Sequence, residues 1–191
     1  MSNYMRTCLI ILLLLGGSAL WADDVRQDLT ILAGLETMVA EDQTLRGIDT
    51  LDYSVIHAAD MQHRQAVFVM LADNEIVSAR AKYLAALLLQ HADPSTCAEC
   101  YLLAHQLSLS ALNMGYEPAR VLAATNLDRY LVFTGQPQKY GTQSNIDSTG
   151  QWYLYPVDSS VSDTERRKWG IQPLDSLKAE IDGLNSEKGP K

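Results

Sequence analysis

Five segments with helical spacing of apolar residues occupy most of the first 133 residues of the chain. We predict helices over 24–46, 58–72, 79–91, 93–113 and 117–133, because apolar side chains in each recur at three- and four-residue intervals. Glycine, proline and acidic clusters separate these segments and end the helices. Such short connections place successive helices side by side. The pattern predicts a mainly α fold, either a single-domain helical bundle or a helical-hairpin array.

The composition changes after Gly135, where an irregular loop over 136–143 begins. Residues 144–155 alternate apolar and polar side chains around a turn at 147–150, which predicts a small β-hairpin near the C-terminus. A short helix capped by Asp163 and stopped by Gly170 should follow, and then a last helix over 173–184. We therefore expect one helical domain over 23–184 and a flexible tail over 185–191.

The first 22 residues have the order of a secretory signal peptide. A short region with Arg6 precedes an apolar stretch over 9–15, and small residues lead to Ala22. We expect cleavage after Ala22 and a periplasmic or secreted mature protein, without stable membrane insertion, because a span needs about 20 apolar residues. A retained N-terminal anchor is the alternative, because Leu20 is not the best residue at position −3.

The charge balance argues against one class of partner. The 191 residues carry a formal net charge of −8, and only 15 of them are lysine or arginine. An acidic surface repels phosphate backbones, and phosphate contacts dominate nucleic-acid binding. We therefore expect no nucleic-acid partner.

Cys97 and Cys100 form a Cys-x-x-Cys pair near the start of the fourth predicted helix. In an oxidising compartment the two can close a local disulfide, which is the reading we favour. A thioredoxin-like motif should follow a strand, and here a helix precedes it. His91 and His105 could complete four zinc ligands, but the spacing matches no closed zinc pattern. We expect no metal and no cofactor.

His91 is the first candidate for chemistry. It lies on the apolar stripe of the third predicted helix, with Gln90 beside it and Asp93 two residues later. A histidine in a last helical turn can satisfy free carbonyls and the helix dipole. The alternative is a general acid and base, with Asp93 or Asp128 as its orienting carboxylate.

Asp128 lies on the fifth predicted helix, which is apolar nearly all round and which we therefore expect to be central. A carboxylate there would be partly buried and would need a partner. Arg129, Arg166 and Arg167 are the candidates. The pairing could be architectural, fixing the C-terminal segment to the helices, or it could belong to an anion-binding cleft.

The loop over 140–143 reads Tyr140-Gly141-Thr142-Gln143. Loops held by a rigid scaffold often carry function. Tyr140 and Gln143 could orient a polar ligand there, or Gly141 could serve only a turn.

Taken in order, the polar residues resemble the pattern of a bacterial family known as a domain of unknown function. The matching elements are Asp42-Gln43 with Arg46, Gln90-His91-Ala92-Asp93, Asp128-Arg129, Tyr140-Gly141-Thr142-Gln143, Thr149-Gly150, and Asp163 to Leu174 with Arg166 and Arg167. The chain departs from the family at Asp60-Met61-Gln62-His63, where members have Asp-x-x-Asn, and its cysteines lie outside the pattern. The resemblance implies a shared polar site and leaves its chemistry open.

Two hypotheses follow. In the first, His91, Asp93 and Asp128 are catalytic, and Gln90, Arg129, Tyr140, Gln143, Arg166 and Arg167 bind an anionic small molecule or peptide. If the protein turns its ligand over, hydrolysis with His91 as acid and base is the simplest reaction. In the second, the same residues are architecture and the helices form a non-catalytic interaction module. An open pocket lined by His91 and Asp128 would favour the first hypothesis, and mutual burial the second.

Overall fold

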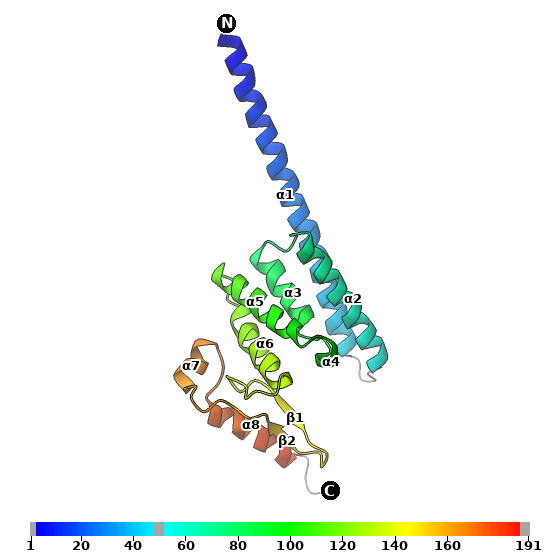
Figure 1. The fold of residues 1–191 in the computed structure, drawn as a ribbon, viewed down its shortest axis with the longest axis vertical. Coiled ribbons are helices and arrows are strands. Elements are labelled where there is room, and N and C mark those ends of the chain that lie inside the picture. Colours follow the sequence, from blue (N-terminus) through cyan, green and yellow to red (C-terminus); the bar gives the residue numbers. More distant parts are fainter. Residues whose placement is uncertain (1–2, 48–51, 188–191) are drawn as a thin grey trace.

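The computed structural model describes residues 3–47 and 52–187, with side chains from Val25 to Ser186. Its fold is mainly helical with a small antiparallel sheet late in the chain, as predicted (Figure 1). The helices before the sheet are α1 (Asn3–Arg46), α2 (Tyr53–Ala72), α3 (Ala79–Leu89), α4 (Pro94–Cys97), α5 (Glu99–Asn113) and α6 (Ala119–Phe133). After them come β1 (Ser144–Ile146), β2 (Trp152–Leu154), α7 (Asp163–Lys168) and α8 (Leu174–Glu187).

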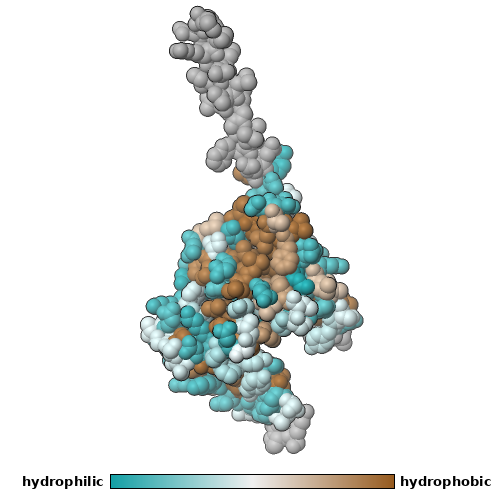
Figure 2. All heavy atoms as spheres, in the orientation of Figure 1, coloured by the Kyte–Doolittle hydropathy of each residue, from teal (hydrophilic) through white to brown (hydrophobic). Residues whose placement is uncertain are grey.

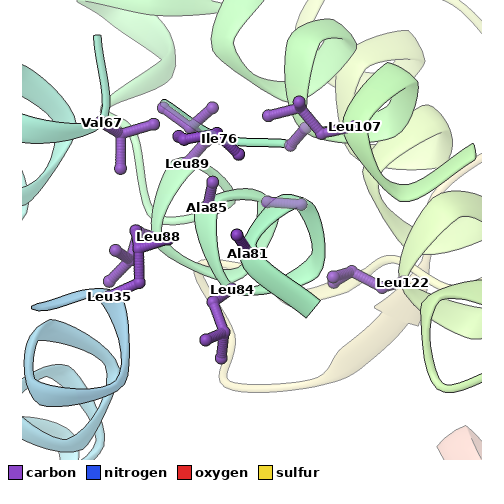
Figure 3. Packing of buried hydrophobic residues seen from close by; sticks show 12 residues of the cluster. Leu35, Val67, Ile76, Ala81, Leu84, Ala85, Leu88, Leu89, Leu107 and Leu122 are labelled. Carbon is purple, nitrogen blue, oxygen red and sulfur yellow. The ribbon is translucent and has the colours of Figure 1, made fainter. Parts of the chain in front are cut away.

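The main core surrounds α3, which contacts α1, α2, α5 and α6. Figure 3 shows this helix with Leu35 of α1, Val67 of α2, Leu107 of α5 and Leu122 of α6 directed at it. The small residues of α3 that face these helices allow their backbones to approach closely. Leu89, at the end of α3, is wholly buried in this cluster.

Several helix ends differ from the sequence prediction. The second helix begins at Tyr53 rather than near residue 58, because Asp52 caps it by accepting the backbone N–H of Ser54. The third ends at Leu89, so His91 lies just beyond the helix. The fourth predicted helix is interrupted at Ala98, and the carboxylate of Asp93 caps its first part, α4.

The position of α6 corrects another expectation. The helix is apolar nearly all round because it lies between two layers, and α3 is the centre of the main core. One side packs on α5, while Ala124 on another side packs with Tyr140 and Ile171 from the C-terminal segment. The helix α6 therefore connects the preceding helices with the C-terminal segment.

The C-terminal segment is built on the predicted hairpin. Asn145 of β1 pairs with Tyr153 of β2, and the carboxylate of Asp147 accepts backbone N–H groups in the turn. The α7 cap is Ser162, not Asp163 as predicted, because the carboxylate of Asp163 accepts the N–H of Leu174 instead.

The last helix corrects the expected flexible tail. α8 packs on β2 and continues to Glu187, past the predicted end at 184. The side chain of Asn185, inside the stretch expected to be flexible, bonds the backbone of Trp152. Residues 188–191 lie outside the described part of the chain.

Apolar side chains on one face gather over the helical array, and the surface of the C-terminal segment is more polar (Figure 2). In the part of the chain that the structure describes, no helix combines the length and the apolar character needed to cross a membrane.

Candidate functional site

A cleft of about 430 Å³ opens where the ends of α1 and α3, the start of α5, the end of α6 and the start of the hairpin meet. It contains four of the predicted residues, which are Gln90, His91, Arg129 and Gln143. Its lining also includes Arg46, Ala92, Tyr101, Val132, Phe133, Ser144, Asn145 and Tyr155. Charged groups, carboxamides and aromatic rings thus meet in one depression that is open to solvent.

The partner of His91 is Asp42 of α1. The Nδ1 atom of His91 lies 2.9 Å from Oδ1 of Asp42, whose side chain is only 3% exposed. Because a carboxylate can only accept, Nδ1–H is the donor and Nε2 remains as the basic nitrogen. Burial raises the pKa of the Asp42 carboxyl, but the hydrogen bond and charge of His91, with smaller contributions from Arg46 and Gln43, bring it below its ordinary value.

Arg46 binds a second carboxylate beside this pair. Its Nη2 atom donates to both carboxylate oxygens of Asp60, at 2.8 and 3.0 Å, and its Nη1 atom lies 3.4 Å from Asp42. Ligand atoms of Asp42, Asp60 and His91 all lie within 4.8 Å of one another, a set that could hold a metal ion. The guanidinium already compensates both carboxylates, so an ion would have to displace Arg46.

Arg129 of α6 lines the same cleft. It donates from Nη1 to the carbonyl oxygen of Gln90 and from Nε to Oε1 of Gln143, at 2.5 and 3.2 Å. Its guanidinium carbon lies 5.8 Å from the centroid of the Tyr101 ring. Among the described residues, no carboxylate forms an ion pair with Arg129.

The pKa of Arg129 reflects this environment. Burial lowers the pKa of the guanidinium, the charge of Tyr101 opposes this effect, and the positive charge of Arg46 adds to it. Arg129 thus shares the cleft with a second cation, Arg46, whose charge disfavours its own. Two arginines and a histidine on one cleft can receive an anion in a bidentate manner.

Asp128 does not lie in the cleft, and none of the arginines proposed from the sequence is its partner. It is wholly buried and accepts the backbone N–H groups of Lys139, Tyr140 and Thr142, at 2.7 to 3.1 Å. The hydroxyl of Thr142 donates to it as well, at 2.9 Å. Four donors from one loop satisfy the carboxylate without a cation. Its role is to fix the 139–142 loop to α6.

Three other predicted residues are also outside the cleft. Tyr140 is buried beneath the loop, and burial, with the charges of Glu165 and Asp128, raises its pKa to about 12. Arg166 is buried and donates to the carbonyl oxygens of Tyr140 and Val161. Arg167 is exposed and donates to the hydroxyl of Thr164. Tyr140 and Arg166 therefore hold the C-terminal segment together, whereas the hydrogen bond of Arg167 lies within α7.

Asp93 is not the orienting carboxylate of His91. It caps α4 by accepting the N–H and the hydroxyl of Ser95, and its Oδ2 atom lies 3.5 Å from His57. An open pocket lined by both His91 and Asp128 would have favoured a ligand site, and only one of the two residues meets this condition. His91 lines the cleft, and Asp128 belongs to the buried architecture.

The predicted disulfide between Cys97 and Cys100 is present at the α4–α5 junction. Because the two sulfur atoms bond each other, neither offers a thiolate to zinc. His105 is directed elsewhere, with Nδ1 bonded to the carbonyl oxygen of Ala123 at 2.8 Å. The four-ligand zinc set considered from the sequence is not assembled.

Sequence reasoning did not select Asp42, Arg46 or Asp60 as site residues. One signal was present, because Asp42 and Arg46 are four residues apart on a helix and therefore share a face. The aromatic wall of Tyr101, Phe133 and Tyr155 carried no such signal, because isolated aromatic residues are common in cores.

No family model, curated protein or solved structure matches this chain.

Proposed function

We propose that this protein binds an anionic group of a small molecule or peptide in the cleft around Arg129. The observation that carries the proposal is a half-buried guanidinium without a carboxylate partner among the described residues, at the wall of an open cleft. A buried charge is costly unless it is compensated. Asp42 and Asp60 are already engaged by His91 and Arg46, so a ligand is the natural counter-charge.

The test is a thermal-shift titration of the protein with inorganic phosphate, acetate and citrate. A ligand that binds only the folded state stabilises it by about 2.7 kcal/mol at a hundredfold excess over Kd. We expect at least one anion to raise Tm, and Arg129→Met to abolish the shift. Arg167→Met is the matched control, because Arg167 is exposed and outside the cleft.

Arg129→Lys separates loss of charge from loss of fold. It keeps the cation but cannot donate to both Gln90 and an incoming anion in the same geometry. A weakened but measurable shift in this variant supports the proposal. Equal shifts in wild type and Arg129→Met, or no shift with any anion, would refute it.

A second function, hydrolysis with His91 as acid and base, is supported by the Asp42–His91 pair. A buried carboxylate that accepts from Nδ1 fixes the tautomer in which Nε2 can take a proton. If p-nitrophenyl esters or phosphates are hydrolysed, His91→Gln and Asp42→Asn should each lower the rate by about 10²-fold or more. Asp93→Asn should leave the rate unchanged, and an equal loss in that variant would refute the assignment.

We also infer that the chain is exported and that it shares its site with the family of unknown function described above. The order of residues 1–22 supports export. Mass spectrometry of the protein recovered from the periplasm or medium should give an N-terminus at Asp23, and an intact N-terminus would favour a retained anchor.

A further inference from the structure

The outer edges of the two hairpin strands differ in how their backbone groups are hydrogen-bonded. β2 is covered on its outer edge by α8, which runs beside it (Figure 1). The Oδ1 atom of Asn185 accepts the N–H of Trp152 at 2.7 Å, and its Nδ2 atom donates to the carbonyl oxygen of Trp152 at 3.0 Å. The carboxamide thus makes the two bonds that a neighbouring strand would make.

Among the residues that the structure describes, no side chain bonds the outer edge of β1 as Asn185 bonds that of β2. Tyr155 donates to the carbonyl oxygen of Gln143, and Asp147 donates to that of Gln151, so residues 143, 145 and 147 face β2. By the alternation of antiparallel pairing, the backbone groups of Ser144 and Ile146 face outward. The N–H of Ile146 is satisfied by the side chain of Asn145. Within the described residues, the N–H and carbonyl oxygen of Ser144 have no hydrogen-bond partner.

This open edge begins at the anion site. Ser144 directly follows Gln143, whose side chain accepts from Arg129, and both Ser144 and Asn145 line the cleft. All three residues of β1 are exposed. An exposed strand edge is a template for another strand. β1 is short, which limits pairing to a short partner strand, and it contains neither proline nor lysine to block it.

Resting on the proposed function of Arg129, we infer that the cleft takes the C-terminal end of an extended peptide. Its terminal carboxylate binds Arg129, and its backbone adds to β1 as an antiparallel strand that bonds Ser144. Antiparallel order follows from the geometry, because the carboxylate end must lie at the Ser144 end of β1. Side chains of the peptide alternate, so one row faces the apolar wall of Tyr101, Val132 and Phe133.

We infer a peptide rather than a free small anion because only a peptide can use both the guanidinium of Arg129 and the open edge of β1. A small anion would satisfy Arg129 and leave the backbone of Ser144 to water, whereas an extended peptide would bond both. Three exposed strand residues span about 10 Å, which three or four peptide residues would cover. The stacked rings of Tyr101 and Phe133, 5.4 Å apart, give a surface for an apolar terminal side chain.

The experiment uses immobilised protein and a randomised pentapeptide pool, half with free C-terminal carboxylates and half with C-terminal amides. Retained peptides are quantified by mass spectrometry, and the most enriched ones are labelled for fluorescence anisotropy. We expect retention of the free acids only, and amidation of a retained peptide should weaken binding by about tenfold or more. Equal retention of acids and amides would overturn the inference.

Two substitutions at one position test strand addition. Ser144→Pro removes the outward N–H, and proline is tolerated where an edge N–H makes no ladder bond. Ser144→Ala keeps the N–H and removes only the hydroxyl. We expect Ser144→Pro to bind the retained peptide about fivefold more weakly than Ser144→Ala does, the value of one backbone hydrogen bond. Equal affinities in the two variants would overturn strand addition, provided that their circular dichroism spectra agree.

The outcomes separate this inference from the function beneath it. If phosphate or citrate raises Tm through Arg129 but no peptide is retained, the anion site stands and the peptide ligand is wrong. If neither the anions nor the peptides bind, both proposals fail.

Discussion

Replacing Asp128 by asparagine should destabilise the protein through a loop rather than through an ion pair. In the native protein Oδ1 accepts from the backbone of Lys139 and Tyr140, and Oδ2 accepts from Tyr140 and from both donors of Thr142. In Asp128→Asn one of these oxygens becomes an NH₂ group. If Oδ2 is the one replaced, the hydroxyl of Thr142 can rotate and accept from it, but the backbone N–H of Thr142 meets another donor.

The expected loss of stability comes from the backbone N–H that is left without an acceptor and from the loss of the carboxylate charge. A buried donor without a partner costs about 1–3 kcal/mol, and the remaining bonds lose their charge assistance. We expect Asp128→Asn to lower the free energy of unfolding by about 2 kcal/mol. Asp128→Ala, which removes all the acceptors, should cost about 4 kcal/mol, less if the loop swings into water.

Urea unfolding followed by circular dichroism measures both variants. Asp175→Asn is the matched control, because its side chain is 96% exposed and its change should stay within about 0.5 kcal/mol. If Asp128→Asn were as stable as wild type, the carboxylate would not hold the loop.

Three further results are expected from the same assay. Leu89→Ala should cost about 2–5 kcal/mol because Leu89, the last residue of α3, is wholly buried, whereas Leu29→Ala, at a residue that is 60% exposed, should cost much less. Replacing both Cys97 and Cys100 by serine should cost about 2 kcal/mol by the loop-entropy estimate for so short a loop, and no change would contradict it. Folding lowers the pKa of Asp42, so the ionised carboxylate stabilises the folded protein at pH values above the pKa of the unfolded state. This stabilisation is lost as the pH falls through the pKa of the folded state. Asp42→Asn should therefore flatten the dependence of stability on pH below about pH 4.

The order and type of the elements could be predicted because they are set by local periodicity and by glycine and proline. Each predicted helix before residue 133 has a counterpart, and so has the hairpin. The ends were less well predicted because they depend on which side chain caps the helix. Asp52, Asp93 and Ser162 are the caps, and nearby hydroxyl and carboxyl groups competed for the same role.

The site was predicted only in part for a different reason. Gln90, His91, Arg129 and Gln143 could be chosen because polar groups beside apolar stripes are unusual. Their partners could not, because Asp42 is 49 residues from His91 in the sequence and contacts it only through the packing of α1 on α3. Sequence proximity suggested Asp93 as the partner, but that carboxylate is occupied by the cap of α4.

The consecutive residues Asp128 and Arg129 show how architecture and site are joined. Neighbouring positions on a helix point about 100° apart, so one side chain enters the loop and the other enters the cleft. The loop fixed by Asp128 ends at Gln143, which accepts from Arg129 and leads into the open edge of β1. If this reasoning is right, Asp128→Asn should weaken anion binding as well as the fold, although Asp128 touches no ligand. An unchanged phosphate or citrate affinity in the folded variant would show that Arg129 alone forms the site.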